Sequence, residues 1–266
     1  MQNLQDFEEF MIEEELALNT RNTYLYALKD FFSRYHELNK RNILEWKAVL
    51  QSKFKPQTVN LRLAAMEKYC KFQGITIPVK RIKIHRTGSV ENVITPEQYE
   101  KLVKGLESDG LTRWLVIVKI MAKTGARVFE ALKFTKKDIQ AGYVDLPAKG
   151  KIRRIYFPKS LTEELNSYLI NLKDNDVLCT NHYGAPITSR GISSQLKIFA
   201  VKYGIPKENA HPHAFRHFFA IEFLKRNSNI SLLADLLGHS GVNTTMIYLR
   251  MSQAQQKEAV DHAVNW

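Results

Sequence analysis

The chain has 266 residues, which is long enough for two domains that each bury their own core. Its 39 Lys and Arg against 27 Asp and Glu give a formal net charge of +12, and this basic excess favours a phosphate-rich partner such as nucleic acid. The longest apolar run, residues 114–121, contains Lys119 and is too short to cross a bilayer. The N-terminus has no secretory signal pattern, so we expect a cytoplasmic protein that does not associate with membranes.

Residues 1–85 are predicted to form a small all-α domain. Apolar residues recur at helical spacing over four segments, at 4–16, 20–35, 43–51 and 56–72. The first 20 residues carry six acidic side chains and no Lys or Arg, whereas residues 21–90 carry 15 basic and 4 acidic ones. We therefore expect the later helices to face DNA and the acidic first helix to point away from it or toward a neighbouring protomer.

A second domain is predicted at residues 94–266, after a linker at 86–93. Residues 80–90 are basic and lack helical periodicity, and Thr95-Pro96 then forms a typical helix start. Helices are expected near 95–107, 111–123, 160–172, 189–203, 212–226 and 229–237. Residues 142–157 show two β-branched and aromatic runs around a Lys-Gly-Lys turn, which predicts a β-hairpin. The fold class is therefore mainly α, with a mixed α+β second domain that contains a small sheet.

Two residue types could indicate a cofactor or a disulfide. Cys70 and Cys179 lie in different predicted domains and show no framework spacing, so we expect reduced thiols. His213 and His217 are one helical turn apart and could bind zinc together with His211. No His-Glu-x-x-His, Cys-x-x-Cys or phosphate-binding Gly-rich loop accompanies them. We therefore predict a reaction that uses neither a metal, nor ATP, nor any other cofactor.

The most specific signal is a set of motifs in the second domain. They are Thr124-Gly125-Ala126-Arg127-Val128-Phe129-Glu130, His213-Ala214-Phe215-Arg216, Leu237-Gly238-His239 and Tyr248. Each has an ordinary explanation when taken alone. Arg127 and Glu130 could form a surface ion pair, His213 and Arg216 could share a solvated helix face, Gly238 could end a helix, and Tyr248 could simply be packed. Their co-occurrence on a basic chain is what favours a function.

Phosphoryl transfer explains these residue types. A phosphodiester under attack becomes a five-coordinate phosphorane with extra negative charge, and forked guanidiniums such as Arg127 and Arg216 can bind its oxygens in pairs. Tyrosine has an ordinary pKa of about 10, so Tyr248 would need a base or a cationic field to act as a nucleophile. His213 is the best candidate for that base.

The order and spacing of these motifs resemble the tyrosine recombinase (phage integrase) family. The resemblance covers nearly the whole chain and is greatest to two-domain Xer-type recombinases and invertases. It implies a site-specific DNA recombinase that forms a 3′-phosphotyrosyl intermediate. It also implies that His239 assists the two arginines, that Glu130 orients Arg127 and that His217 supports the site by hydrogen bonding. The Lys-Gly turn of the hairpin would carry the general acid, which selects Lys149 with Lys151 as the alternative.

The resemblance also implies how DNA is bound. The first domain would be the core-binding (SAM-like) domain, and the DNA-binding candidates are Thr20, Arg21, Thr58, Arg62, Lys80 and Arg81. Ordinary helix capping is the alternative role for the two threonines. The partner would be double-stranded DNA with paired inverted-repeat half-sites, bound by a homo-tetramer. Residues 254–266 could form a helix that docks onto a neighbouring protomer or packs in cis.

Two other functions are compatible with the same motifs. A type IB topoisomerase shares the chemistry but rejoins the original strand, and a non-catalytic DNA-binding regulator could retain the scaffold. The regulator would be expected to lack at least one of the motif residues, and none is missing.

Overall fold

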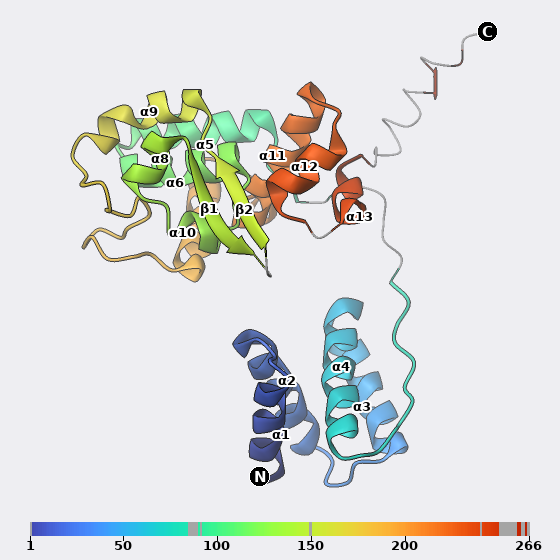
Figure 1. Ribbon diagram of the computed structural model, residues 1–266. Helices are drawn as coiled ribbons and strands as arrows, with labels where there is room; N and C mark the ends of the chain where they lie inside the picture. Colours follow the sequence, from blue (N-terminus) through green and yellow to red (C-terminus); the bar gives the residue numbers. More distant parts are fainter. Residues whose placement is uncertain are drawn as a thin grey trace. The chain divides into compact units, whose positions relative to one another are not determined.

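The computed structural model describes residues 2–84, 90, 92–148, 151–239, 241–249, 260–261 and 264. The chain divides into two compact units, residues 1–87 and residues 88–266 (Figure 1). The described residues form helices and one two-stranded antiparallel sheet, which confirms the predicted, mainly α fold class. Within these ranges, no helix has both the length and the apolar composition needed to cross a membrane.

The first unit contains all four predicted helices. They are α1 (Gln2–Glu13), α2 (Leu18–Phe32), α3 (Lys40–Lys53) and α4 (Pro56–Phe72). Their apolar stripes meet in an aromatic core, in which the ring of Phe31 packs edge-on against Trp46 with 5.4 Å between centroids. Phe7 packs in the same way on Tyr69 at 5.1 Å, and this contact joins α1 to α4.

Arg62 is buried in this unit, although the sequence indicated a DNA contact. Only 8% of the residue is exposed. Its Nη1 donates to Asp30 Oδ2 at 2.9 Å, and its guanidinium lies 4.3 Å from the ring centroid of Phe54. Trp46 Nε1 donates to the same carboxylate oxygen at 2.9 Å. Arg62 therefore links α2 to α4 as a structural residue, and its predicted DNA contact stays a prediction.

The extended segment at residues 75–84 packs against the first unit. Ile77, Val79 and Ile82 contact its core. Asn60 binds the backbone of Ile82 twice, because Asn60 Nδ2 donates to the Ile82 carbonyl at 2.9 Å and Asn60 Oδ1 accepts from the Ile82 N–H at 2.8 Å. This part of the basic segment therefore belongs to the helical unit. Most of the predicted linker, residues 86–93, lies outside the described residues.

The second unit is built around α6 (Thr112–Thr124), which is apolar on most sides. α6 packs against α5 (Pro96–Ser108), α9 (Lys159–Leu169) and α11 (Pro212–Arg226). The remaining elements are α7 (Val128–Ala131), α8 (Lys136–Ala141), β1 (Tyr143–Ala148), β2 (Lys151–Tyr156), α10 (Ser189–Lys202), η1 (Lys207–Asn209), α12 (Ile230–Leu237), α13 (Val242–Thr245) and η2 (Met246–Leu249). α7, α8 and α13 were not predicted, because helices of four to six residues show no clear periodicity.

The predicted hairpin is present as β1 and β2, which lie side by side in Figure 1. The register pairs Tyr143 with Tyr156 and Leu146 with Arg153. Side chains alternate across β2, so Arg153 and Ile155 are buried whereas Ile152 is exposed. β2 contacts α12, and this contact brings the inner face of the hairpin to the C-terminal end of that helix.

The Arg62 network predicts a measurable stability difference. Arg62→Met should lower the free energy of unfolding of the first unit by about 2 kcal/mol, because Asp30 loses a buried partner while keeping its charge. Arg41→Met is the matched control, since Arg41 forms an exposed pair with Glu45 that contributes less than about 0.5 kcal/mol. Hydrogen exchange of α2–α4 amides in the full chain measures both. Equal effects of the two substitutions would contradict the structural role of Arg62.

Candidate active site

Arg127 and Glu130 meet at the start of α7. Gly125 ends α6 in the left-handed conformation (φ 61°), and the chain turns so that Arg127 becomes the residue that precedes α7. The Arg127 N–H donates to Glu130 Oε2 at 2.7 Å, and Arg127 Nη1 donates to Glu130 Oε1 at 3.1 Å. The arginine side chain keeps 30% of its surface exposed. Glu130 thus holds the Arg127 guanidinium at the surface of the site.

Arg216 approaches the same place from α11. Only 3% of the residue is exposed. Its Nη1 donates to the Gly125 carbonyl at 2.7 Å and its Nη2 to the Leu237 carbonyl at 2.5 Å. Arg127 Nη2 donates to the next carbonyl, that of Gly238, at 3.2 Å. The two arginines named by the sequence therefore converge on the C-terminal end of α12.

A third arginine, Arg153, lies in this cluster and was missed by the sequence analysis. Its Nη1 donates to both oxygens of Glu130, at 2.7 and 2.8 Å. Its Nε and Nη2 both donate to the Leu236 carbonyl, at 3.1 and 2.8 Å. Arg153 is 5% exposed. The alternation of β2 carried a signal, because Arg153 shares the inward phase of the strand with Ile155.

The site has more positive than negative charge. Among the described residues of this cluster, three guanidiniums accompany one carboxylate, that of Glu130, which pairs with Arg127 and Arg153. Burial lowers the pKa of Arg216 to about 10, and repulsion from Arg127 and Arg153 contributes to this change. Burial and the same three arginines lower the pKa of His239 to about 4. A partly buried cluster with an excess of cationic donors favours the binding of an anion with several oxygens, such as a phosphate.

Tyr248 lies on η2 and contacts α11. Its ring packs against the buried cluster of Ala220, Leu233 and Leu237, and its hydroxyl is 2.8 Å from Nδ1 of His217. Burial raises the pKa of Tyr248, and Arg216 partly opposes this rise. Burial, followed by repulsion from His213, lowers the pKa of His217 to about 4, so this imidazole is neutral at pH 7. The structure thus brings His217 to the phenol.

His213 lies one helical turn before His217, and their ring centroids are 6.1 Å apart. His213 is exposed. Its pKa is lowered by partial desolvation and by repulsion from Arg216 and Arg127. The structure therefore places His213 at the open side of the cluster. The histidine in contact with the Tyr248 hydroxyl is His217.

His239 follows the left-handed Gly238 (φ 62°) that ends α12. Its Nδ1 is 2.8 Å from the hydroxyl of Thr245, which is fully buried in α13. This contact fixes the ring plane and leaves Nε2 as the free ring nitrogen. The short helix α13 therefore orients His239 and also leads the chain into η2 with Tyr248.

The three histidines considered for zinc do not form a metal centre. The His211 ring is the N-cap of α11, where its Nδ1 accepts from the Ala214 N–H at 3.1 Å. His217 uses its Nδ1 for Tyr248. Over the described ranges, no three His, Cys, Asp or Glu side chains are grouped in a way that could hold a metal ion. Cys70 and Cys179 are both buried and unpaired.

The general-acid candidates fall at the hairpin turn. Lys149 lies outside the described residues, as does the side chain of Lys151. The last described pair before the turn joins Ala148 to Lys151. The choice between the two lysines therefore stays a prediction.

The remaining DNA-binding candidates lie on the first unit. Thr20 and Thr58 occupy the first turns of α2 and α4, and neither helix start has a side-chain cap, so neither threonine acts as an N-cap. Arg21 Nε is buried without an acceptor in the described structure.

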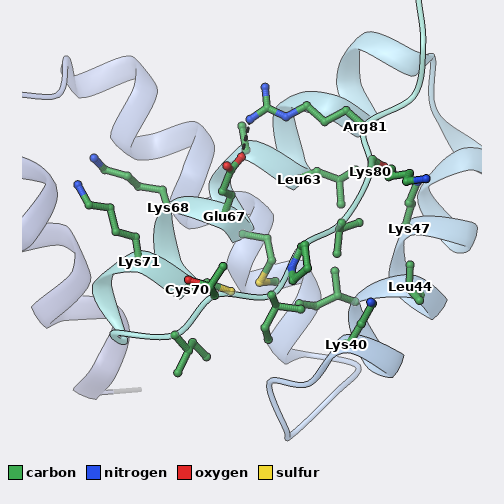
Figure 2. Close-up of a pocket in the computed structure, with 18 of the residues that line it drawn as sticks. Lys40, Leu44, Lys47, Leu63, Glu67, Lys68, Cys70, Lys71, Lys80 and Arg81 are labelled. Carbon is green, nitrogen blue, oxygen red and sulfur yellow. Dashed lines mark hydrogen bonds and ion pairs between the residues drawn. The ribbon is translucent and has the colours of Figure 1, made fainter.

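The other two candidates lie on the basic segment that follows α4. Lys80 is exposed, and Arg81 pairs with Glu67 at 2.6 Å. Figure 2 shows Lys80 and Arg81 at the edge of a concave surface that Lys40, Lys47, Lys68 and Lys71 also line.

The chain is similar to known tyrosine recombinases. Residues 92–255 match the family model described as the phage integrase family. Tyrosine recombinase XerA of Pyrococcus furiosus is 29% identical, with 98% of this chain and 93% of the relative covered. Tyrosine recombinase XerD of Halalkalibacterium halodurans is 27% identical, with 98% and 96% covered.

Two solved structures have a similar fold. One is XerH recombinase bound to palindromic difH substrate in a post-cleavage complex, with a TM-score of 0.73, 22% identity and coverage of 93% of this chain and 81% of that one. The other is a dimer of lambda integrase residues 75–356 bound to a COC′ core site, with a TM-score of 0.76, 16% identity and 96% of each chain covered. These likenesses support the fold of the chain.

The family match covers more than half of the chain, so the chain belongs to the phage integrase family. Together with its relatives, this makes it a site-specific tyrosine recombinase of the Xer type. The matched residues, 92–255, include every motif of the second unit, from Arg127 to Tyr248.

The lowered pKa of His217 predicts how stability depends on pH. Between about 6.5 and about 4 the unfolded histidine binds a proton that the folded one does not, so the free energy of unfolding should fall as pH falls through this window. His217→Gln should lose less stability between pH 7 and pH 5 than the wild type. Urea denaturation at both values measures this, with His182→Gln, at an exposed histidine of the same unit, as the control. An unchanged loss in His217→Gln would contradict the buried neutral state.

Proposed function

We propose that this recombinase cleaves and rejoins DNA at the arginine cluster, with Tyr248 as the nucleophile. The observation that carries the proposal is the convergence of Arg127, Arg153 and Arg216 on one helix end, beside a tyrosine, with Glu130 bound to Arg127 and Arg153. A phosphodiester would bring the negative charge that this cluster lacks. Arg127 is the more exposed guanidinium, and Arg216 and His239 flank it, so these three would contact the phosphate oxygens.

The covalent step exchanges one phosphoester bond for another. The phenolic oxygen of Tyr248 attacks phosphorus, the bond from phosphorus to the 5′-oxygen breaks, and a 3′-phosphotyrosyl link forms. The phenolic proton passes to a histidine, and Lys149 gives a proton to the leaving 5′-oxygen. The free 5′-hydroxyl of a partner strand then attacks phosphorus and gives its proton to Lys149. The bond from phosphorus to the Tyr248 oxygen breaks, the phenolate takes its proton back from the histidine, and a DNA phosphodiester is restored. No outside energy is required, because one phosphodiester is formed for each one broken.

Two histidines are candidates to accept the phenolic proton. His213 was selected from the sequence, and its position near Arg216 and Arg127 suits a group that also contacts the phosphate. His217 is neutral and is already hydrogen-bonded to the phenol. We assign proton acceptance to His213 in the DNA-bound state and the holding of Tyr248 before cleavage to His217.

The proposed partner is double-stranded DNA with paired inverted-repeat half-sites, bound by four copies of the chain in the cytoplasm. The first unit would act as the core-binding domain, with Thr20, Arg21, Thr58, Lys80 and Arg81 near the phosphates. The uncapped starts of α2 and α4 support this, because free backbone N–H groups at a helix start bind phosphate. The predicted C-terminal helix, residues 254–266, lies almost entirely outside the described residues, and its docking in trans is part of the proposal.

The named relatives are recombinases, which favours strand exchange over the topoisomerase and regulator alternatives. Strand exchange differs from relaxation only in which 5′-hydroxyl attacks the intermediate, so the same site serves both reactions. Relaxation of supercoiled DNA without exchange would support the topoisomerase function.

Tyr248→Phe should abolish a covalent protein–DNA adduct while leaving DNA binding within about twofold of wild type. The substrate is a nicked suicide duplex that carries half-sites selected by the protein from random DNA. Because arginine and histidine supply the positive charge, wild-type protein should form the adduct in the presence of a chelator. Denaturing gels and peptide mapping of the adduct measure this. An adduct in Tyr248→Phe, or one that requires a divalent metal, would overturn the proposed function.

Lys149→Ala should slow cleavage of the ordinary phosphodiester roughly 100-fold or more, since an unprotonated 5′-oxygen is a poor leaving group. A 5′-bridging phosphorothiolate releases a thiolate, which needs no proton. The cleavage rate of Lys149→Ala on that substrate should therefore approach the wild-type rate, whereas Arg127→Ala should stay slow on both. If the phosphorothiolate restores Lys151→Ala and Lys149→Ala is already active, Lys151 is the general acid.

A further inference from the structure

The C-terminal end of α12 is bound by three different arginines at three consecutive carbonyls. Arg153 donates to Leu236, Arg216 donates to Leu237 and Arg127 donates to Gly238. The last carbonyls of a helix have no partner within the helix, and its C-terminal end carries partial negative charge. This helix end therefore acts as a common anchor for the three guanidiniums.

Arg153 differs from Arg127 in how many of its guanidinium nitrogens remain available to a ligand. Its Nε and both Nη atoms donate to Glu130 or Leu236, and 4% of its side chain is exposed. Arg127 keeps 30% of its side chain exposed. Arg153 is therefore fully engaged within the protein, whereas Arg127 can still present N–H groups to a ligand.

The Arg153 side chain also packs tightly against the backbone at the end of α12. The left-handed Gly238 leaves a space that the Arg153 side chain fills, and a Cβ added at Gly238 would lie 2.3 Å from Arg153 Cδ. The next residue is His239. Any displacement of Arg153 would therefore move the turn that presents His239 and the carbonyl that holds Arg127.

We propose that Arg153 is a positioning residue for strand cleavage, which fixes the end of α12 against Glu130 so that Arg127, Arg216 and His239 form one phosphate-binding surface. This inference rests on the proposed function. Arg153 does not touch the DNA. It acts through Glu130 on one side and through the Leu236 carbonyl on the other, and these two contacts require the fork of a guanidinium.

Arg153→Lys tests this role, because lysine keeps the charge beside Glu130 but cannot bind Glu130 and Leu236 together. The variant should bind a half-site as wild type does and cleave the suicide duplex roughly 10- to 100-fold more slowly at saturating protein, as expected for a small displacement of reacting groups. Arg154→Lys is the matched control on the next residue of β2. Arg154 pairs with Asp145 on the exposed face of the hairpin, so this variant should cleave at the wild-type rate.

Gly238→Ala approaches the same contact from the other side. It should slow cleavage as Arg153→Lys does, because the new methyl group displaces the arginine. Gly142→Ala is its control, since Gly142 has φ 78° and no atom within 4 Å of an added Cβ. Both substitutions place alanine at a positive φ and so introduce similar backbone strain. Circular dichroism at the assay temperature measures the fraction of folded protein for each variant. After correction for that fraction, only Gly238→Ala should slow cleavage.

The 5′-bridging phosphorothiolate separates the possible causes. If Arg153 positions the phosphate-binding groups, Arg153→Lys stays slow on this substrate relative to wild type. Restoration by the phosphorothiolate would instead place its effect on the general acid and overturn the proposal, as would wild-type cleavage by Arg153→Lys. Absence of an adduct with wild-type protein is a different result, and it would overturn the proposed function itself.

Discussion

The site depends on the way α12 ends. Gly238 takes the left-handed conformation, the helix stops, and three carbonyls are left to be bound from outside the helix. Arginines from α7, β2 and α11 bind them, and these elements are far apart in the sequence. One helix end thus gathers three guanidiniums, and His239 follows it directly.

The charge balance of this cluster links its stability to its function. Glu130 is shared by Arg127 and Arg153, and Arg216 is held by carbonyls alone. Burial, followed by repulsion from Arg127 and Arg153, lowers the pKa of Arg216 to about 10. A DNA phosphate would relieve this repulsion. The arginines that repel one another in the DNA-free site would thereby stabilise both the bound phosphodiester and the five-coordinate phosphorane.

Most helices and the hairpin could be predicted, because apolar residues recur with a period near 3.6 in the longer helices and alternate with a period of 2 in the strands. The positions of Arg127, Arg216, His239 and Tyr248 followed from motif order. The burial of Arg62 and of Arg153 was not predicted, and the reason is common to both. Arg62 lies on the apolar stripe of α4 beside Val59 and Leu63, and Arg153 shares the inward phase of β2 with Ile155, yet a basic residue is usually assigned to the surface.

The partners of these two arginines could not be read from the sequence. Asp30 is 32 residues from Arg62, and the Leu236 carbonyl is 83 residues from Arg153. A backbone carbonyl has no sequence signature at all. The contact of His217 with Tyr248 could not be read from the sequence either. The motifs assign both His213 and His217 to the site, and their spacing does not show which of the two reaches the phenol.

The most direct measurement is a structure of the protein with vanadate bound between Tyr248 and a cleaved DNA end, which mimics the five-coordinate phosphorus. Arg127, Arg216 and His239 should contact the equatorial oxygens of the vanadate, while Arg153 stays on Glu130 and the Leu236 carbonyl. A complex in which Arg153 leaves these partners to bind the vanadate, or in which Arg127 and Arg216 do not contact it, would contradict the division of roles among the three arginines.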